Sequence, residues 1–161
     1  MRTILAEPIT ADAFAPFGEL LVAPAAPGRD YFDGALSNGR PGARPSVSLA
    51  VADPIPPLPH DAVVLERHEF SSQSFLPLDA ERYLVVVAAH AAGGGPDTAQ
   101  ARAFLVPGNL GVTFRADVWH HPMATLDRRG TFAIVMWIDG SAADTELVTL
   151  EAPFRVAVAG S

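Results

Sequence analysis

Two apolar runs decide the fold: Tyr83-Leu-Val-Val-Val-Ala-Ala89 and Phe132-Ala-Ile-Val-Met-Trp-Ile138. Both are rich in β-branched and aromatic residues, which favour strands. Both are also too short to cross a bilayer, which takes about 20 residues. Unbroken apolar runs of this length are typical of strands that are covered on both faces. We therefore expect two central strands with most of their apolar residues buried.

Shorter runs of the same kind lie on either side of these two, and turn residues separate them. The further expected strands are 19–22, 47–52, 63–69, 72–76, 103–106, 111–115 and 147–150. Strand starts roughly ten residues apart are typical of a β-sandwich or barrel. One short helix is expected, from Ala11 to Ala15, with Thr10 as its N-cap. These elements predict a single all-β domain over residues 1–161.

Composition excludes several classes of chemistry. The chain has a net charge of −7, no cysteine, and arginine as its only cationic residue besides histidine. Disulfides, thiolate nucleophiles and lysine Schiff bases are therefore excluded. Scattered arginines in an acidic chain also disfavour nucleic acid and anionic membranes as partners. Glu7, Pro8 and Asp12 interrupt the first stretch where a signal peptide would be apolar, so we expect a cytoplasmic protein.

The densest group of chemically versatile side chains is Trp119-His120-His121-Pro122. Because adjacent side chains on a strand face opposite sides of a sheet, we expect His120 to face the barrel cavity and His121 to lie outside that pocket. A β-bulge at Asp117 or Val118 would exchange the two rings. A strand end packed under a turn, with no catalytic role, is the alternative interpretation.

A second polar cluster extends from Glu66 to Leu78, and alternation places Gln73 and Phe75 on one face. If His68 and Gln73 are buried they need partners, since an unpaired buried polar group costs on the order of 1–3 kcal/mol. The alternative is an edge strand with a solvated polar face.

In these two clusters and in several other stretches, the sequence resembles that of the ureidoglycolate lyase family. The similarity runs through TADAFAPFGEL at 10–20, ERH at 66–68, SQSFLPL at 72–78, RAFLV at 102–106, GVTF at 111–114 and VWHHP at 118–122. The resemblance implies a cupin-type double-stranded β-helix barrel, jelly-roll-like, and a homodimer that pairs through edge strands. It also implies a lyase that cleaves ureidoglycolate to glyoxylate and urea in allantoin and purine nitrogen catabolism.

Resemblance to the wider cupin superfamily bears on metals. Arg115, Asp117 and His120 have the spacing of its second ligand motif, Pro-x-Gly-x-x-His. The best match to the first motif, His-x-His followed by Glu, is Gln73-Ser74-Phe75 with Glu81. Because Phe cannot ligate, we expect no tight metal site and no required cofactor, although weakly bound nickel or manganese could enhance turnover.

These residues suggest a division of roles, as a hypothesis. His120 and Glu81 would share the acid and base work, since histidine titrates near neutral pH. His68 and Gln73 would orient the ureido group. Arg115 or Arg82 would hold the substrate carboxylate.

Two departures from the family pattern support a second interpretation. The polar block between the first strands is compressed within 24–45, and Val51 stands where the family often carries an arginine. The alternative function is a cupin-like protein that binds small carboxylates through a degenerate site, with no or different activity. A metal-dependent isomerase or dioxygenase is disfavoured by Gln73 and Phe75.

Overall fold

The computed structural model describes residues 1–160 and consists almost entirely of strands. In chain order the elements are β1 (Arg2–Leu5), β2 (Glu7–Pro8), α1 (Ala11–Phe14), β3 (Gly18–Leu21), β4 (Arg44–Ala52), β5 (His60–His68), β6 (Gln73–Asp79), β7 (Arg82–Ala88), η1 (Thr98–Gln100, a 3-10 turn), β8 (Arg102–Pro107), β9 (Gly111–Phe114), β10 (Trp119–His120), β11 (Ala124–Thr125), β12 (Gly130–Ile138) and β13 (Thr145–Ala157). The predicted all-β class is confirmed.

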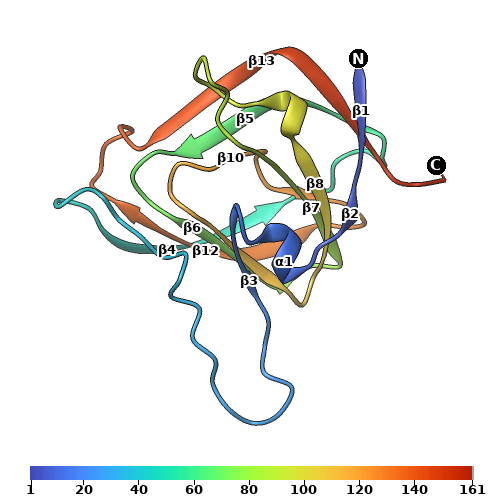
Figure 1. Cartoon of the computed structure of the whole chain (residues 1–161). Coiled ribbons are helices and arrows are strands. Elements are labelled where there is room, and N and C mark those ends of the chain that lie inside the picture. Colours follow the sequence, from blue (N-terminus) through green and yellow to red (C-terminus); the bar gives the residue numbers. More distant parts are fainter. Residues whose placement is uncertain (161) are drawn as a thin grey trace.

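The strands form two sheets that face each other as the walls of a barrel (Figure 1). The eight-stranded sheet has the order β1-β13-β5-β10-β7-β8-β2, with β11 beside β7. The five-stranded sheet has the order β3-β9-β6-β12-β4. In Figure 1, β13 and β5 run along the top of the molecule, β4, β6 and β12 lie below them, and the long loop after β3 extends to the bottom. Strands distant in the sequence therefore meet, and β10 lies between β5 and β7.

The short helix α1 closes one side of the barrel. Thr10 caps it as predicted, because its Oγ1 accepts a hydrogen bond from the N–H of Ala13 at 3.2 Å. Phe14, at its last turn, is fully buried and packs edge-on against Phe104 and Phe114. The helix thus contributes an aromatic anchor to the interior of the barrel.

Strand β7 is covered on both faces, as its unbroken apolar run predicted. Tyr83, Val85 and Val87 face the interior between the two sheets. The alternate residues Leu84, Val86 and Ala88 pack into a second apolar cluster on the other face of the eight-stranded sheet, with Trp119, Phe154 and Val156 among its members. Burial of every residue from Tyr83 to Ala88 makes β7 the central strand of the fold.

The expectation for the second run is wrong. Of Phe132–Ile138, only Phe132 is fully buried, and Ile138 is exposed. Phe132 and Ile134 contact the interior cluster, whereas Ala133 and Val135 alternate onto the outer face of the five-stranded sheet, opposite Leu49 and Val47 of β4. The sequence of β12 is therefore apolar on both faces, although no strand or helix among the described residues covers the outer face.

Several elements have no clear signal in the sequence. Strands β1 and β2 are short and pair with β13 and β8, which lie far away along the chain. Strand β13 extends to Ala157, well past the predicted end at Leu150. Among the described residues, no helix is both long and apolar enough to cross a membrane.

Candidate functional site

Four polar side chains from three strands meet inside the barrel. Glu66 and His68 come from β5, Gln73 from β6 and His120 from β10. Glu66 and His68 share a face because they are two residues apart on one strand, and His120 lies opposite Glu66 in the β5–β10 pairing. One ligand atom each from Glu66, His68 and His120 lies within 4.8 Å of the other two.

The cluster is enclosed by apolar groups. His120, His68 and Gln73 are 1%, 5% and 7% exposed, whereas the Glu66 side chain is 19% exposed. The ring of Phe114 stacks on the His120 ring, with 4.3 Å between centroids and an interplanar angle of 10°. Glu66 is therefore the member of the cluster that is most accessible to solvent.

The hydrogen bonds of His120 define its protonation. Its Nδ1 lies 2.9 Å from the carbonyl oxygen of Val118, which can only accept, so Nδ1 carries a proton. Its Nε2 lies 3.2 Å from Gln73 Oε1 and 3.5 Å from Glu66 Oε1. Two acceptor oxygens thus face Nε2, so this nitrogen is placed either to donate to them or to share a cation with them. The hydrogen bond to His120 also lowers the pKa of Glu66, which favours the carboxylate.

His68 has an unused ligand atom. Its Nδ1 lies 3.2 Å from Thr145 Oγ1, whereas its Nε2 is buried with no hydrogen-bond partner among the described residues. Burial lowers the pKa of His68, and the neighbouring His120 lowers it further, so the neutral ring is favoured. A neutral imidazole with a free buried nitrogen is suited to bind a ligand.

The donor set fits a divalent metal ion. Two imidazoles and one carboxylate are ligands that nickel, manganese and zinc accept. Such an ion would give His68 Nε2 the partner that it lacks. It would also be attracted by the two oxygens that face His120 Nε2. Glu66, His68 and His120 can therefore hold a metal, more readily than the sequence motifs suggested.

Three of the predicted site residues lie elsewhere. Arg82 is distant from His120. His120 lies opposite Val87 of β7, and Arg82 lies five residues before Val87, about 16 Å along the strand at 3.3 Å per residue. Arg82 pairs with Asp127, at 2.7 and 2.5 Å. The Glu81 side chain is 61% exposed. Arg115 follows Phe114, is exposed, and donates to the carbonyl oxygen of Gly34 at 2.9 Å.

Glu66 is the member of the cluster that the sequence analysis missed. The motif comparison placed the paired ligand positions at Gln73 and Phe75, but the ring of Phe75 packs edge-on against Phe114. The pair that shares a face with a ligand-like spacing is Glu66 and His68, on the preceding strand. The alternation of Glu66-Arg67-His68 within a predicted strand is the signal that could have identified it.

His121 lies apart from this cluster. Its Nε2 is 3.3 Å from His60 Nε2, and its Nδ1 is 2.7 Å from the carbonyl oxygen of Pro122. The side chains of His120 and His121 therefore keep the orientations predicted from strand alternation, although Asp117, just before β10, adopts a left-handed φ of 68°. The N–H of Asp117 donates to the carbonyl oxygen of His68 at 2.7 Å, which joins this turn to the end of β5.

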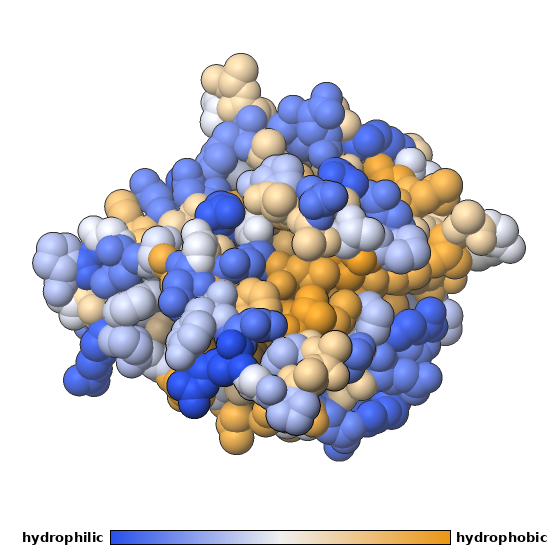
Figure 2. Space-filling model, turned by 60° about the horizontal axis from the view of Figure 1, so that its bottom comes forward, coloured by the Kyte–Doolittle hydropathy of each residue, from blue (hydrophilic) through white to orange (hydrophobic). Residues whose placement is uncertain are grey.

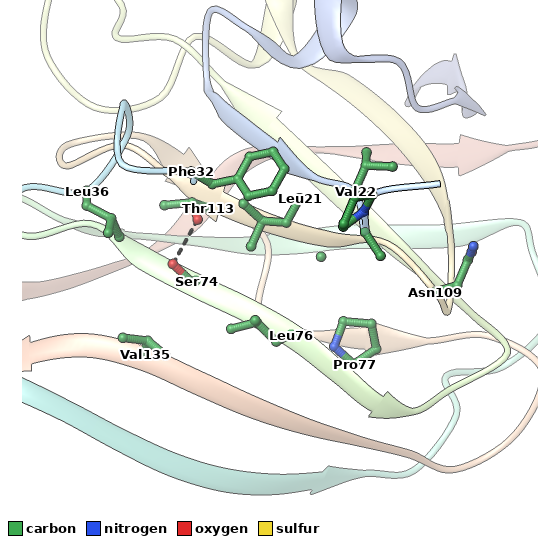
Figure 3. A pocket seen from close by; sticks show the side chains of 13 residues that line it. Leu21, Val22, Phe32, Leu36, Ser74, Leu76, Pro77, Asn109, Thr113 and Val135 are labelled. Atoms are coloured by element: carbon green, nitrogen blue, oxygen red, sulfur yellow. Dashed lines mark hydrogen bonds between the residues drawn. The ribbon is translucent and has the colours of Figure 1, made fainter. Parts of the chain in front are cut away.

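A separate apolar cavity of about 420 Å³ lies on the outer side of the five-stranded sheet. Phe32 and Leu36 of the 22–36 loop line one wall, and Leu76 and Val135 line the sheet side (Figure 3). Ser74 and Thr113 share a 2.8 Å hydrogen bond there. Because Ser74 is adjacent to Gln73 on β6, it faces away from the polar cluster, so this cavity is not part of that site.

The chain is similar to known proteins of one enzyme family. The family model described as ureidoglycolate lyase matches residues 1–157. The ureidoglycolate lyase of Pseudomonas syringae pv. tomato is 36% identical over 149 residues, covering 84% of this chain and 83% of the relative. That of Brucella anthropi is 37% identical over 143 residues, with 84% and 83% covered. Among solved structures, a dTDP sugar isomerase from Desulfovibrio desulfuricans G20 aligns with a TM-score of 0.49 and 18% identity over 84% of each chain. The chain belongs to the ureidoglycolate lyase family.

Proposed function

We propose that this protein is a carbon–nitrogen lyase that cleaves ureidoglycolate to glyoxylate and urea, within allantoin and purine nitrogen catabolism. The observation that carries the proposal is the buried cluster of Glu66, His68, Gln73 and His120 in a chain of this family. The cluster holds a carboxylate beside an imidazole, which are the two kinds of group that proton transfer in this reaction requires.

The reaction needs one base and one acid. The reacting carbon of ureidoglycolate carries a hydroxyl, a carboxylate and a urea nitrogen. Removal of the hydroxyl proton forms the carbonyl of glyoxylate, the C–N bond breaks, and its electron pair leaves with nitrogen, which takes up a proton. No water is consumed, so the step is an elimination rather than a hydrolysis.

Glu66 and His120 suit these two roles. The lowered pKa of Glu66 favours a carboxylate, which can accept the hydroxyl proton. His120, held as a donor between two oxygens, can deliver a proton to the leaving nitrogen. We therefore assign to Glu66 the role that the sequence suggested for Glu81, and we retain His68 and Gln73 as groups that orient the ureido group.

A nickel or manganese ion held by Glu66, His68 and His120 would supply Lewis-acid polarisation of a substrate oxygen. Gln73 and the Phe114 ring restrict the space around His120 Nε2. Because an ion would occupy the Glu66 carboxylate and His120 Nε2, the proton transfers assigned to these two groups belong to the site without an ion.

For the substrate carboxylate, we favour Arg115 over Arg82. Arg115 directly follows the ring that stacks on His120, and only one carbonyl contact holds its exposed side chain. Arg82 lies at the end of β7 that is distant from His120, and its Nε and Nη2 donate to the carboxylate of Asp127.

The test is to incubate the purified protein with ureidoglycolate and to measure urea, ammonia and glyoxylate separately. The proposal predicts equal amounts of urea and glyoxylate and no ammonia. Ammonia release would indicate a hydrolase instead. Binding of ureidoglycolate without any product would favour the small-carboxylate binding protein.

We also propose a cytoplasmic homodimer that covers the outer face of β4. This nine-residue strand is at an edge of its sheet, and Val47, Leu49 and Val51 are 64–70% exposed on one side of it. Figure 2 shows hydrophobic residues gathered near the middle of the face that lies at the bottom of Figure 1. Long unprotected edge strands are normally paired or covered. Sedimentation should give a dimer at micromolar concentration, and Leu49→Arg should give a monomer.

A further inference from the structure

The turn between β5 and β6 connects two members of the polar cluster. His68 is the last residue of β5 and Gln73 is the first residue of β6, so residues 69–72 determine how these side chains lie relative to each other. Both are buried. A small change in this turn would therefore move one partner of His120 relative to the other.

One residue from a different strand holds this turn. Asp144, which immediately precedes β13, is only 5% exposed. Its Oδ1 accepts from the N–H of Phe70 at 2.8 Å, and its Oδ2 accepts from the hydroxyl of Ser71. Its backbone carbonyl accepts from the N–H of Glu69 at 3.0 Å. Three consecutive turn residues thus bind a single aspartate.

The charge of Asp144 is balanced by Arg40. The Nη2 of Arg40 lies 3.3 Å from Asp144 Oδ2 and donates to the carbonyl oxygen of Trp137 at 3.0 Å. Arg40 also pairs with Asp139, at 2.8 Å from Nη1. Arg40 thus gives the buried carboxylate of Asp144 a charged hydrogen-bonding partner. Asp139 shares the same arginine, and its other hydrogen bonds within residues 1–160 come from Ser141 rather than from the 69–72 turn, so it provides a matched control.

The next residue, Thr145, contacts His68 itself. The two residues are opposite each other in the β5–β13 pairing, and Thr145 Oγ1 lies 3.2 Å from His68 Nδ1. If the hydroxyl accepts the Nδ1 proton, the lone pair of His68 resides on Nε2, the buried atom without a partner. Outer contacts of this kind set the tautomer and direction of ligand histidines.

We propose that Asp144 and Thr145 are positioning residues of the active site. Asp144 fixes the turn between His68 and Gln73, and Thr145 keeps the proton of His68 on Nδ1, so that Nε2 faces the cluster as an acceptor. Neither residue touches the substrate. The expected change in kcat rests on the proposed function, whereas the tautomer of His68 and the contacts of the turn do not depend on any activity.

The first test compares Thr145→Val with Thr145→Ser. Thr145 is exposed as a residue, so loss of its hydroxyl should leave the thermal midpoint almost unchanged. We expect Thr145→Val to lower kcat for urea release about 10-fold with little change in KM, as for other lost outer contacts. Thr145→Ser, which keeps the hydroxyl, should behave like the unaltered chain. Thr149→Val, an exposed threonine farther along β13, is the control.

A second measurement needs neither activity nor metal. Long-range ¹H–¹⁵N NMR of the metal-free protein reports which nitrogen of His68 carries the proton. The unaltered chain and Thr145→Ser should show the Nδ1–H form, and Thr145→Val should shift toward Nε2–H. An unchanged tautomer in Thr145→Val, or equal effects of valine and serine, would overturn the role of Thr145. If the tautomer shifts but no variant releases urea, the positioning holds and the proposed reaction fails.

Asp144→Asn tests the turn, with Asp139→Asn as its matched control. Asparagine keeps an acceptor for Phe70, but its Nδ2 is a donor and accepts from neither Ser71 nor Arg40. We expect Asp144→Asn to lower kcat more than KM changes, and Asp139→Asn to leave both nearly unaltered. Equal kinetics in the two variants would remove Asp144 from the proposal. If Asp144→Asn does not fold, Ser71→Ala reports on the same contact.

Discussion

His120 and His121 are adjacent in the sequence but belong to opposite faces of the eight-stranded sheet. His120 lies in the barrel interior with Glu66, His68 and Gln73 around it. The side-chain partner of His121 is another imidazole: its Nδ1–H faces the carbonyl oxygen of Pro122, so its Nε2 accepts from His60 Nε2–H. A carboxylate neighbour gives His120 a charge partner for proton transfer, and His121 has none at hydrogen-bond distance. The comparison shows that two residues of the same type have different surroundings, and those surroundings favour His120 over His121 for the proposed acid–base role.

The largest expected effect tests this contrast directly. His120→Ala should lower turnover by about 10²–10⁴-fold, the loss typical of a general acid or base. His121→Ala should retain turnover, and its effect should appear in thermal stability. Urea release by both variants under the same conditions is the measurement. Full activity in His120→Ala with loss in His121→Ala would reverse the assignment, and full activity in both would exclude β10 from the mechanism.

A second experiment distinguishes the two carboxylates. Glu66→Gln keeps the shape of the side chain but cannot accept the substrate proton, so we expect kcat to fall about 10²-fold. Glu81→Gln, on an exposed loop before β7, should have the activity of the unaltered chain. Steady-state kinetics at one pH are sufficient. If Glu81→Gln lost activity and Glu66→Gln did not, the acid–base carboxylate would be Glu81, as the motif spacing suggested.

A third experiment distinguishes the two arginines. Arg115→Ala should raise KM about tenfold, because a charge-assisted hydrogen bond to a carboxylate contributes about 1.5–3 kcal/mol. Arg82→Ala removes an exposed pair with Asp127 and should change KM very little. Initial rates over a range of ureidoglycolate concentrations give both values. A KM effect confined to Arg82→Ala would contradict the placement of the substrate carboxylate near Phe114.

The sequence predicted those parts of the fold and site that depend on local pattern. The run from Tyr83 to Ala88 is apolar on both faces and is buried on both. His68, Gln73 and His120 were selected by motif and strand alternation, and the structure brings them together. Strands β1 and β2 were missed because they are short and gain their stability from parallel partners far along the chain.

The errors share one physical origin. Glu81 and Arg82 follow the polar block closely in sequence, but they lie at the start of β7, whereas Val87, which is opposite His120, lies five residues farther on, about 16 Å away at 3.3 Å per residue. Which end of a strand lies at the cavity depends on sheet topology, which no local pattern encodes. The same holds for β12, whose apolar outer face is covered by no strand or helix among the described residues.

The smallest expected effect concerns the His60–His121 pair and its response to acid. Burial lowers the pKa of His60 below its ordinary value of 6.5, so the unfolded chain binds a proton there more readily than the folded chain. The free energy of unfolding should therefore fall as pH drops below about 6.5, because protonation then favours the unfolded state. His60→Gln removes this titrating group while keeping a polar side chain, and should reduce that acid-dependent loss of stability. Urea denaturation of both proteins at pH 7.5 and pH 5.5 measures the difference. A larger loss in His60→Gln than in the unaltered chain would show that the pair stabilises the protein in its protonated form, and that its role differs from the neutral contact described above.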